Sequence, residues 1–437
     1  MALNEVNITR GDVRSVPLFC RAKALAWLNP GINFVFGWVR VFSVDEKEVP
    51  DAALESCIKI LRARLGSEAL IEHMWASNVG FFSRSDVIDD TELCRDLQSG
   101  LANLNGRRYR IQMGLHLARH PEAVSTRMLA FAGLAMHLAG KNAKLPFKWY
   151  DDDFLDTPIA RETFYGLIEQ AVGQDRFVIY LQPVFDCKEQ PRIVAAEALV
   201  RWRHPYYGFL LPSLFLPLLG RMQMLDVVDL HMLGRVCQLQ AKRIDTGLPI
   251  VPISVNLARD DMLLDEEFSS KVIKTVDSHG LDHDLVQFEL LEGYPSMGDI
   301  SNYPLGTVAR QIGLLHDAGF SILIDDYGSG ASNINTLCTM PFDILKLDKH
   351  LIDQCSGNKT ISCILQSLVN CMHKMGHKII AEGVETPHQL ETMQKMGCKL
   401  IQGFYLSKPL HIVNFEALLE QQKQANNHIH THSKHLN

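Results

Sequence analysis

The chain has 437 residues, of which 47% are apolar and 21% are charged, and its formal net charge at pH 7 is −7. These values are typical of an ordinary globular protein with two or three domains, and the negative balance excludes a basic face for nucleic acid or anionic lipid. The longest apolar run, residues 209–219, is too short to span a membrane, and the first 13 residues lack the apolar core of a signal peptide. The ten cysteines form no Cys-x-x-Cys pair, so we expect reduced thiols in a cytoplasmic protein with no nucleic-acid partner and no membrane insertion.

The first 150 residues predict a small α/β unit, because strand patterns alternate with helical ones. Strands are expected at residues 34–42, 69–74, 79–82 and 109–117, and helices at residues 52–65, 91–104 and 125–138. The second and third strands predict a hairpin around Trp75, Ala76, Ser77 and Asn78. A linking helix is expected over residues 151–174, where apolar residues recur at helical spacing.

Residues 175–415 follow a different rhythm, in which short apolar strand candidates are separated by stretches suited to helices. The eight strand candidates are residues 177–185, 195–202, 250–257, 285–291, 321–326, 344–348, 378–385 and 400–404. Helical patterns fill most of the gaps, at residues 225–243, 305–318, 360–375 and 387–396. A segment of this length with eight strands and intervening helices predicts a single (β/α)8 TIM barrel. The polar tail, residues 416–437, carries His428, His430, His432 and His435 and predicts a flexible terminus, although such histidines also bind metal adventitiously.

Polar side chains recur on or near the C-terminal halves of these strands, where barrel enzymes place catalytic residues. They are Glu197, Asn256, Glu289, Asp325, Asp326, Lys346, Glu382 and Gln402. Charged residues inside a barrel are costly unless they are paired or bind metal. Five carboxylates around one lysine need shifted pKa values or bound cations. Oxygen ligands without Cys or His favour Mg²⁺ or Mn²⁺, and this many carboxylates suit a pair of ions roughly 3.5–4 Å apart.

Asp325 and Asp326 follow one apolar strand directly. Consecutive strand residues point to opposite faces, so both carboxylates reach one site only if the backbone turns there. We expect Gly328 and Gly330 to permit that turn. The alternative is a solvated turn, in which Asp and Gly are ordinary residues.

The motifs on these strands resemble, in order, those of the EAL domain family of cyclic di-GMP phosphodiesterases. They are Gln182-Pro183, Glu197-Ala198-Leu199, Ser254-Val255-Asn256-Leu257, Glu289-Leu290-Leu291-Glu292, Asp325-Asp326-Tyr327-Gly328-Ser329-Gly330, Leu345-Lys346-Leu347-Asp348, Ala381-Glu382-Gly383-Val384-Glu385-Thr386 and Gln402-Gly403-Phe404. The resemblance covers about residues 160–412 and implies a modified barrel whose first strand runs antiparallel to the others. The implied reaction is metal-assisted hydrolysis of cyclic di-GMP to linear pGpG.

The resemblance also implies a role for each motif residue. Glu197, Asn256, Glu289 and Asp325 would ligate a first metal ion, and Asp325 would bridge to a second ion held with Asp326 and Glu382. Lys346 would position the attacking water, with Glu382 as the candidate general base, and Gln402 would support the metal shell. Gln182 and Arg201 would contact the substrate, Arg201 through a phosphate. Glu292 would hold the loop after the paired aspartates.

The first 150 residues loosely resemble a GGDEF domain, the diguanylate cyclase fold. Residues 50–54 match a segment that precedes a family helix, and residues 133–141 resemble the closing helix of the family, but the signature Gly-Gly-Asp-Glu-Phe falls on Trp75-Ala76-Ser77-Asn78-Val79. The glycines that admit GTP phosphates and the acidic pair that handles metal are therefore replaced. We expect a degenerate domain without cyclase activity, serving in a homodimer or as the surface for a protein partner.

Three functions are compatible with these patterns: a phosphodiesterase, a cyclic di-GMP receptor that does not hydrolyse its ligand, and a scaffold that only binds other proteins. Receptors of this kind often lack metal ligands, whereas this chain keeps the full set. Buried charge without a use is a liability, which argues against the scaffold.

Overall fold

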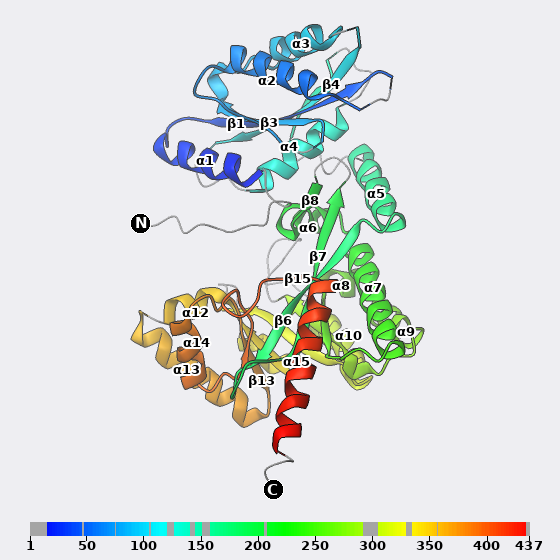
Figure 1. Cartoon of the computed structure of the whole chain (residues 1–437), viewed down its shortest axis with the longest axis vertical. Helices are drawn as coiled ribbons and strands as arrows, with labels where there is room; N and C mark the ends of the chain where they lie inside the picture. The colour runs from blue at the N-terminus through cyan, green and yellow to red at the C-terminus, as the bar shows by residue number, and fades with distance from the viewer. Residues whose placement is uncertain are drawn as a thin grey trace. The chain divides into compact units, whose positions relative to one another are not determined.

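The computed structural model describes residues 15–45, 48–74, 76–104, 106–119, 126–139, 145–150, 158–204, 208–291, 305–328, 334–355 and 357–433. The chain divides into two units (Figure 1). Unit 1 comprises Met1–Arg176 and Trp202–Leu218, and unit 2 comprises Phe177–Arg201 and Leu219–Asn437. This division differs from a simple cut near residue 150 or 174, since one strand, β7 (Arg192–His204), has residues in both units. The domain boundaries predicted from the sequence stay a prediction.

Unit 1 is built on a five-stranded sheet in the order β2-β3-β1-β4-β5. Its strands are β1 (Phe34–Ser43), β2 (Leu70–His73), β3 (Asn78–Arg84), β4 (Tyr109–Ala118) and β5 (Phe147–Trp149). The predicted hairpin is confirmed, because β2 and β3 pair antiparallel on either side of residues 74–77. The described helices of this unit are α1 (Ser15–Leu28), α2 (Asp51–Leu65), η1 (Ser85–Val87), α3 (Asp90–Leu101), α4 (Thr126–Leu138) and α5 (Pro158–Gly173). The second segment of the unit adds the strand β8 (Gly208–Leu210) and most of the helix α6 (Pro212–Arg221).

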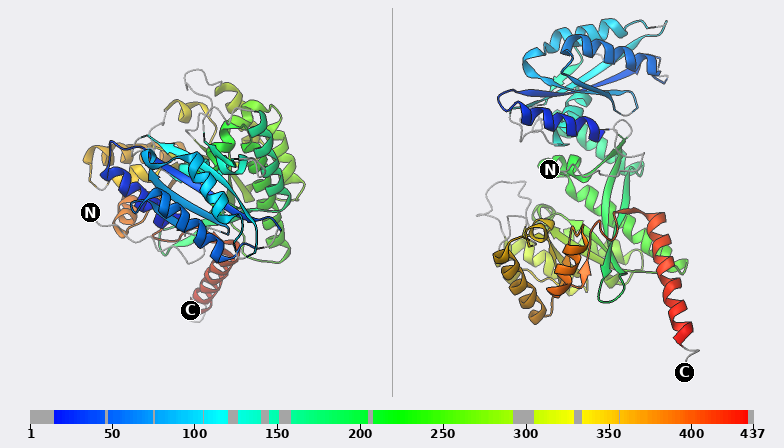
Figure 2. Two further views of the ribbon diagram at one scale, coloured as in Figure 1. Left: turned by 90° about the horizontal axis from the view of Figure 1, so that it is seen from above. Right: turned by 60° about the vertical axis from the view of Figure 1, so that its left-hand side comes forward.

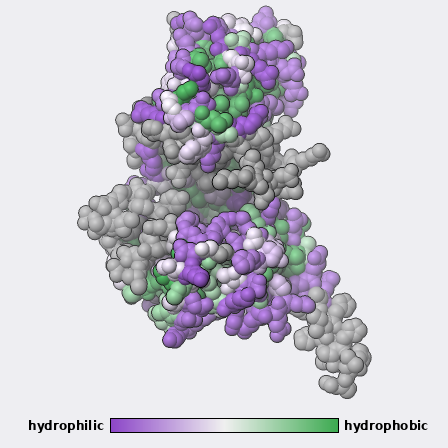
Figure 3. Space-filling view, turned by 90° about the vertical axis from the view of Figure 1, so that its left-hand side faces the viewer, coloured by the Kyte–Doolittle hydropathy of each residue, from purple (hydrophilic) through white to green (hydrophobic). Residues whose placement is uncertain are grey.

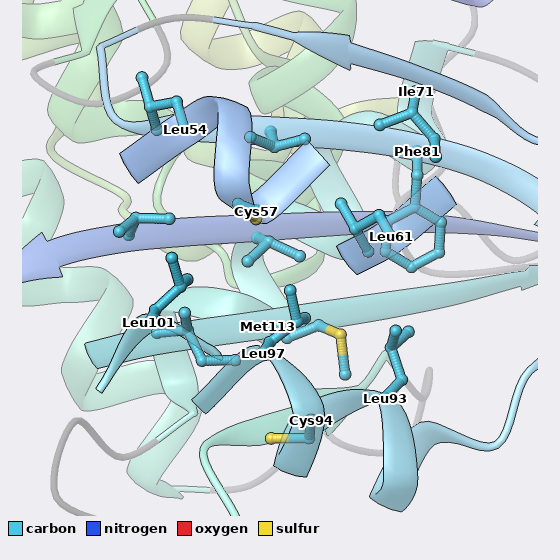
Figure 4. Close-up of a cluster of buried hydrophobic side chains, with 14 of the residues drawn as sticks. Leu54, Cys57, Leu61, Ile71, Phe81, Leu93, Cys94, Leu97, Leu101 and Met113 are labelled. Carbon is cyan, nitrogen blue, oxygen red and sulfur yellow. The ribbon is translucent and has the colours of Figure 1, made fainter. Parts of the chain in front are cut away.

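Helices cover both faces of this sheet (Figure 2, right). On one face, α2 and α3 pack their apolar side chains against the central strands, as Leu61, Leu97, Phe81 and Met113 illustrate (Figure 4). On the other face, α1 and α4 cover a second cluster of apolar residues. Helix α4 lies very close to β4: a Cβ at Gly114 would stand 1.9 Å from the carbonyl oxygen of Ala132. The predicted strands and helices of this region are therefore confirmed, and α1 and β5 are additions that the sequence patterns did not reveal.

Unit 2 contains a closed barrel of eight strands, which confirms the predicted barrel. Its strands are β6 (Phe177–Asp186), β7, β9 (Ile253–Leu257), β10 (Val286–Leu291), β11 (Ser321–Tyr327), β12 (Ile344–Leu347), β13 (Lys378–Ala381) and β14 (Leu400–Ile401). The order is β6-β14-β13-β12-β11-β10-β9-β7, and pairing of β7 with β6 closes the ring. From β7 round to β14 the pairs are parallel, whereas β6 is antiparallel to β14, the arrangement expected of the first strand.

Helices follow most of the barrel strands (Figure 1). They are α7 (Leu225–Asp245), α8 (Arg259–Leu264), α9 (Phe268–Asp277), η4 (His283–Leu285), α10 (Leu305–Asp317), α11 (Ile334–Thr339), α12 (Lys349–Cys355), α13 (Lys359–Met375) and α14 (Pro387–Lys395). Local sequence sets their ends. In α14, Thr386 and Gln389 form a reciprocal capping box and Pro387 occupies the first turn.

The C-terminal segment differs from its prediction. The sequence predicts a flexible tail over residues 416–437, whereas the structure has a helix, α15 (Ile412–Ser433), over most of this segment. A short strand, β15 (Leu410–His411), precedes the helix and pairs with β6. Phe415 and Leu419 are buried, and the Gln422 side chain exchanges hydrogen bonds with the backbone of Ile193 at 2.6 and 3.0 Å. The apolar positions at a spacing of four and this side-chain bond explain why the segment is a helix. The part beyond residue 433, with His435, lies outside the described residues.

Within the described parts of the chain, none of the helices has the length and apolar character needed to cross a bilayer. Hydrophilic residues cover much of each unit on the face that Figure 3 displays. All the cysteines whose side chains the structure describes are free thiols, as predicted.

Candidate metal and phosphodiesterase site in the barrel

The barrel interior is layered, and the polar side chains form the layer above an apolar one. The apolar cluster consists of Val184, Ala195, Leu323, Ile344, Ile380 and Leu400. Side chains two residues apart on a strand share a face, so each of these positions has a same-face neighbour one layer up. Those neighbours are Gln182 on the antiparallel strand β6 and then Glu197, Asp325, Lys346, Glu382 and Gln402. The apolar layer therefore closes the barrel beneath the site and leaves the polar layer at the end of the strands where TIM-barrel active sites lie.

Lys346 is the centre of this layer. Its side chain is 1% exposed, and its Nζ lies 2.6 Å from Glu289, 2.7 Å from Glu382, 3.0 Å from Asp325 and 3.3 Å from Glu197. Burial lowers the pKa of the Lys346 ammonium, but the four carboxylates outweigh burial and raise that pKa well above its usual value. The lysine therefore stays charged at any physiological pH and holds carboxylates from four strands or strand ends around one point.

Gln402 completes the contacts of Glu197. Its Nε2 donates a 2.6 Å hydrogen bond to Glu197 Oε2, the oxygen that also faces Lys346. The Gln402 Oε1 is buried and has no hydrogen-bond partner within the described part of the chain. A buried acceptor of this kind suits a metal-bound water, because buried polar atoms are otherwise paired. The observation fits the predicted role of Gln402 beside a metal.

The paired aspartates reach one site through a β-bulge. Ile324 pairs with Leu345 and Tyr327 pairs with Leu347, so Asp325 and Asp326 together stand opposite Lys346 alone. Asp326 has φ of 55°, the left-handed region that a side chain seldom adopts. The backbone therefore turns at Asp326 itself, which the sequence did not predict. Gly328 also lies at positive φ, +101°, as expected of a glycine in this turn, and a Cβ there would stand 2.0 Å from Leu351. Gly330 lies outside the described residues.

Two groups of carboxylates come close enough to hold cations. Glu197, Glu289 and Asp325 form one group, Asp325, Asp326 and Glu382 form the other, and within each group one oxygen per residue lies within 4.8 Å of the others. Asp325 belongs to both, which is the arrangement expected of a bridging ligand. The residues therefore fit a site for hard divalent cations, which prefer carboxylate oxygens as ligands.

Burial and the proximity of other carboxylates raise the pKa values of several of these carboxyl groups. Burial and then the charge of Glu197 raise the pKa of Glu289 to about 8. Burial and then the charge of Asp325 raise the pKa of Asp326 to about 6. Burial also raises the pKa of Glu382 well above its usual value, although Lys346 opposes it. A bound cation would relieve this repulsion.

The remaining predicted residues lie on the strands of the same site. Asn256 on β9 is the register partner of Glu289 on β10, so both side chains share the inner face. Arg201 lies on β7, four residues after Glu197 and on the same face, and its guanidinium stands 5.5 Å from the centre of the Tyr180 ring. Glu292 and the loop residues 329–333 lie outside the described residues, so the predicted hold of Glu292 on that loop stays a prediction.

The hairpin in unit 1 has no comparable set of acids among its described residues. Asn78 begins β3 and is fully buried, and the carbonyl oxygen of Ser77 accepts a 2.9 Å hydrogen bond from the backbone N–H of Val41. Ala76 has φ of 50°, and Trp75 lies outside the described residues. A buried amide at this position is poorly placed to serve a nucleotide.

One residue of the site, Ser254, was not predicted from the sequence, although it belongs to the motif that contains Asn256. Ser254 on β9 is buried, and its hydroxyl donates a short hydrogen bond to Glu289 Oε1. It lies two residues before Asn256 and so shares its face. That spacing was the available signal, but a serine inside a strand carries no charge that demands an explanation.

Metal is expected to stabilise the protein more at pH 8.5 than at pH 6. Protons compete with cations for Glu289 and Asp326 below their raised pKa values, so metal affinity falls as the pH falls from about 8 to about 6. At pH 8.5 and about 100 Kd of Mn²⁺, ligand linkage contributes about 2.7 kcal/mol, which is about 5–10 °C in Tm for a unit of this size. The sign is opposite without metal. Raised carboxyl pKa values favour folding while those groups are protonated, so the metal-free protein loses stability as the pH rises from the ordinary carboxyl pKa of about 4 to the raised values of about 6 for Asp326 and about 8 for Glu289. Thermal unfolding with and without Mn²⁺ at both pH values measures this, and an equal shift at both would contradict it.

Comparison with known proteins places these features in a family. A family model described as "EAL domain" matches residues 167–409, more than half of the chain. The chain is 28% identical over 296 residues to "Cyclic di-GMP phosphodiesterase NbdA" of Pseudomonas aeruginosa, covering 67% of this chain and 36% of that protein. It is 25% identical over 283 residues to "Oxygen sensor protein DosP" of Escherichia coli, covering 65% of this chain and 34% of that protein. The matched parts thus span about a third of the length of these two relatives.

Solved structures give the same picture for the barrel. The structure titled "PaMucR Phosphodiesterase, c-di-GMP complex" is 26% identical, has a TM-score of 0.51 and covers 58% of this chain and 99% of that one. The structure titled "Structure of EAL enzyme Bd1971 - cAMP bound form" has a TM-score of 0.51 and covers 90% of this chain and 96% of that one. Its sequence identity is 17%, so this likeness concerns the fold alone.

Proposed function

The chain belongs to the EAL domain family, and we therefore propose that it hydrolyses cyclic di-GMP to linear pGpG in the barrel of unit 2. The observation that carries the proposal is Lys346 among four carboxylates, which together with Asp326 form two acidic groups that share Asp325. Support for the substrate comes from relatives named as cyclic di-GMP phosphodiesterases and from a related phosphodiesterase solved with c-di-GMP.

We assign the metal ligands as Glu197, Asn256, Glu289, Asp325, Asp326 and Glu382. The donor set is oxygen only, which favours Mg²⁺ or Mn²⁺ over Zn²⁺. Two such ions, when bound, would activate a water and offset charge that builds on the phosphoryl oxygens.

The protein's own groups account for the rest of the reaction. Arg201 and Gln182 bind the substrate, with the Arg201 guanidinium on a phosphate. Lys346 Nζ remains protonated and orients the attacking water. Glu382, the candidate general base, takes the proton of that water at a carboxylate oxygen. The water oxygen bonds to phosphorus and the bond from phosphorus to the ribose 3′ oxygen breaks. The 3′ oxygen takes up a proton, which balances the one that Glu382 accepts, and the product carries a 3′ hydroxyl and a 5′-phosphate.

The second candidate function is a receptor that binds cyclic di-GMP without cleaving it. The experiment that separates the candidates incubates the purified full chain with cyclic di-GMP and Mg²⁺ or Mn²⁺, and resolves pGpG by chromatography. A phosphodiesterase forms pGpG only with metal. A receptor binds the ligand and leaves it intact, and a scaffold does neither.

Unit 1 is proposed to be a degenerate GGDEF-like module that supports a homodimer or binds a protein partner, in a cytoplasmic protein. We expect the purified protein to form no cyclic di-GMP from GTP, because the sequence has Trp75 and Ala76 in place of the two glycines and Ser77 and Asn78 in place of the acidic pair. Incubation with GTP and Mg²⁺, with the product measured after blocking hydrolysis by Glu197→Gln, tests this. Synthesis of cyclic di-GMP that disappears on mutation of the hairpin would contradict the degenerate assignment. The proposed homodimer is tested separately, by light scattering of the purified protein.

A further inference from the structure

Ser254 has an unusual position for a small uncharged residue, because it lies in the polar layer between two of the acidic strands. It is 3% exposed and is the register partner of Glu197 on β7. Its hydroxyl donates to Glu289 Oε1 on β10, and its oxygen stands 3.3 Å from the carbonyl oxygen of Ala196, the residue before Glu197. A hydroxyl has one proton to give, and the bond to a charged carboxylate is stronger than the bond to a backbone carbonyl.

The hydroxyl matters because of what holds the other oxygen of Glu289. Glu289 Oε2 lies 2.6 Å from Lys346 Nζ, so each carboxylate oxygen has its own donor, one on β9 and one on β12. Two donors on opposite sides fix the rotation of a carboxylate, whereas one donor leaves it free to turn. Glu289 is 1% exposed, so no solvent is at hand to replace a lost donor.

We propose that Ser254 is a positioning residue that holds the Glu289 carboxylate in the orientation needed to share a divalent cation with Glu197 and Asp325. This inference rests on the proposed function and adds a residue to its site. Partners that orient a metal ligand are typically worth about 10–100-fold in metal affinity or activity.

The test measures Mn²⁺ affinity of metal-stripped full-length protein by calorimetry, with no turnover involved. Ser254→Ala removes one hydroxyl, and we expect Mn²⁺ affinity to fall about 10-fold or more. At saturating Mn²⁺, kcat is expected to fall while KM for cyclic di-GMP stays within about twofold, because Ser254 holds a metal ligand and not a substrate contact. Ser254→Thr keeps a hydroxyl and is expected to retain Mn²⁺ affinity within about threefold of wild type.

Ser269→Ala is the matched control. Ser269 is also fully buried, and its hydroxyl donates a 2.9 Å hydrogen bond to the backbone oxygen of Gln311, on helices outside the site. This variant is expected to lower Tm by as much as Ser254→Ala or more, with Mn²⁺ affinity unchanged. Equal losses of Mn²⁺ affinity in both variants would overturn the inference, since they would reflect general destabilisation.

A double-mutant cycle identifies the residue through which Ser254 acts. If it acts through Glu289, adding Ser254→Ala to Glu289→Gln causes no further loss of Mn²⁺ affinity. Losses that multiply, or a single Ser254→Ala variant within twofold of wild type, would overturn the inference. Its failure is distinct from failure of the proposed function: a wild-type protein whose Mn²⁺ affinity depends on Ser254 and Glu289 but that forms no pGpG would contradict only the proposed function.

Discussion

Lys346→Met is expected to lower turnover of cyclic di-GMP by about 10²–10³-fold or more and to destabilise the metal-free protein by about 3–5 kcal/mol. The ammonium is fully buried among four carboxylates, so its removal leaves their charge uncompensated and removes the group that orients water. Methionine keeps most of the side-chain volume, which separates the loss of charge from the creation of a cavity. Steady-state kinetics and thermal unfolding in chelator measure the two effects.

Metal binding should survive this change, because lysine is not a ligand. Saturating Mn²⁺ is expected to raise the Tm of Lys346→Met at least as much as that of wild type. Lys395→Met is the control, since Lys395 pairs with Glu391 on an exposed helix face, where solvent screens the pair and it contributes little to stability. Turnover by Lys346→Met near the wild-type rate would show that the assignment of Lys346 is wrong.

Glu197→Gln is expected to reduce turnover to the background rate. The substitution keeps the shape of the side chain but removes the charge that faces Lys346 and belongs to the first acidic group. Metal affinity is expected to fall by more than about 10-fold, since a direct ligand contributes at least as much as the partners that orient one. Calorimetry with Mn²⁺ and product analysis measure both effects.

The control for this charge change is Glu189→Gln, at an exposed position between β6 and β7. It alters the net charge equally and is expected to leave turnover and metal affinity unchanged. If Glu197→Gln retained wild-type metal affinity, the first acidic group would not be a metal site.

The sequence predicted the barrel because eight strand patterns alternate with helical ones, and it predicted the site because polar residues recur near the ends of those strands. An apolar residue and a polar residue two positions later recur as Ala195 and Glu197, Leu323 and Asp325, Ile344 and Lys346, Ile380 and Glu382, and Leu400 and Gln402. Each pair is readable without knowledge of the others, since alternate residues share a face. Charges at interior positions also stand out on their own, because they need a partner.

Features that depend on the pairing of distant strands were not readable in this way. The bulge at Asp325 and Asp326 exists because two residues of β11 stand opposite one residue of β12, a register that neither strand specifies alone. The hydrogen bond of Ser254 to Glu289 joins residues 35 positions apart. The antiparallel direction of β6 followed from family resemblance and not from any property of its residues.

The end of the chain was misjudged for a related reason. Residues from 416 onward are polar enough to predict a flexible tail, yet α15 is anchored by Phe415, Leu419 and the two hydrogen bonds that the Gln422 side chain exchanges with the backbone of Ile193. That partner lies 229 positions earlier, so composition carried no sign of it.

The most direct test of the account is one reaction in water enriched in oxygen-18, with cyclic di-GMP, Mn²⁺ and the full-length protein, analysed by mass spectrometry. The account predicts pGpG that carries one oxygen-18 in its 5′-phosphate, formed by the wild-type protein and not by Glu197→Gln. Intact cyclic di-GMP, or the same labelled product from both proteins, would contradict hydrolysis at the carboxylates around Lys346.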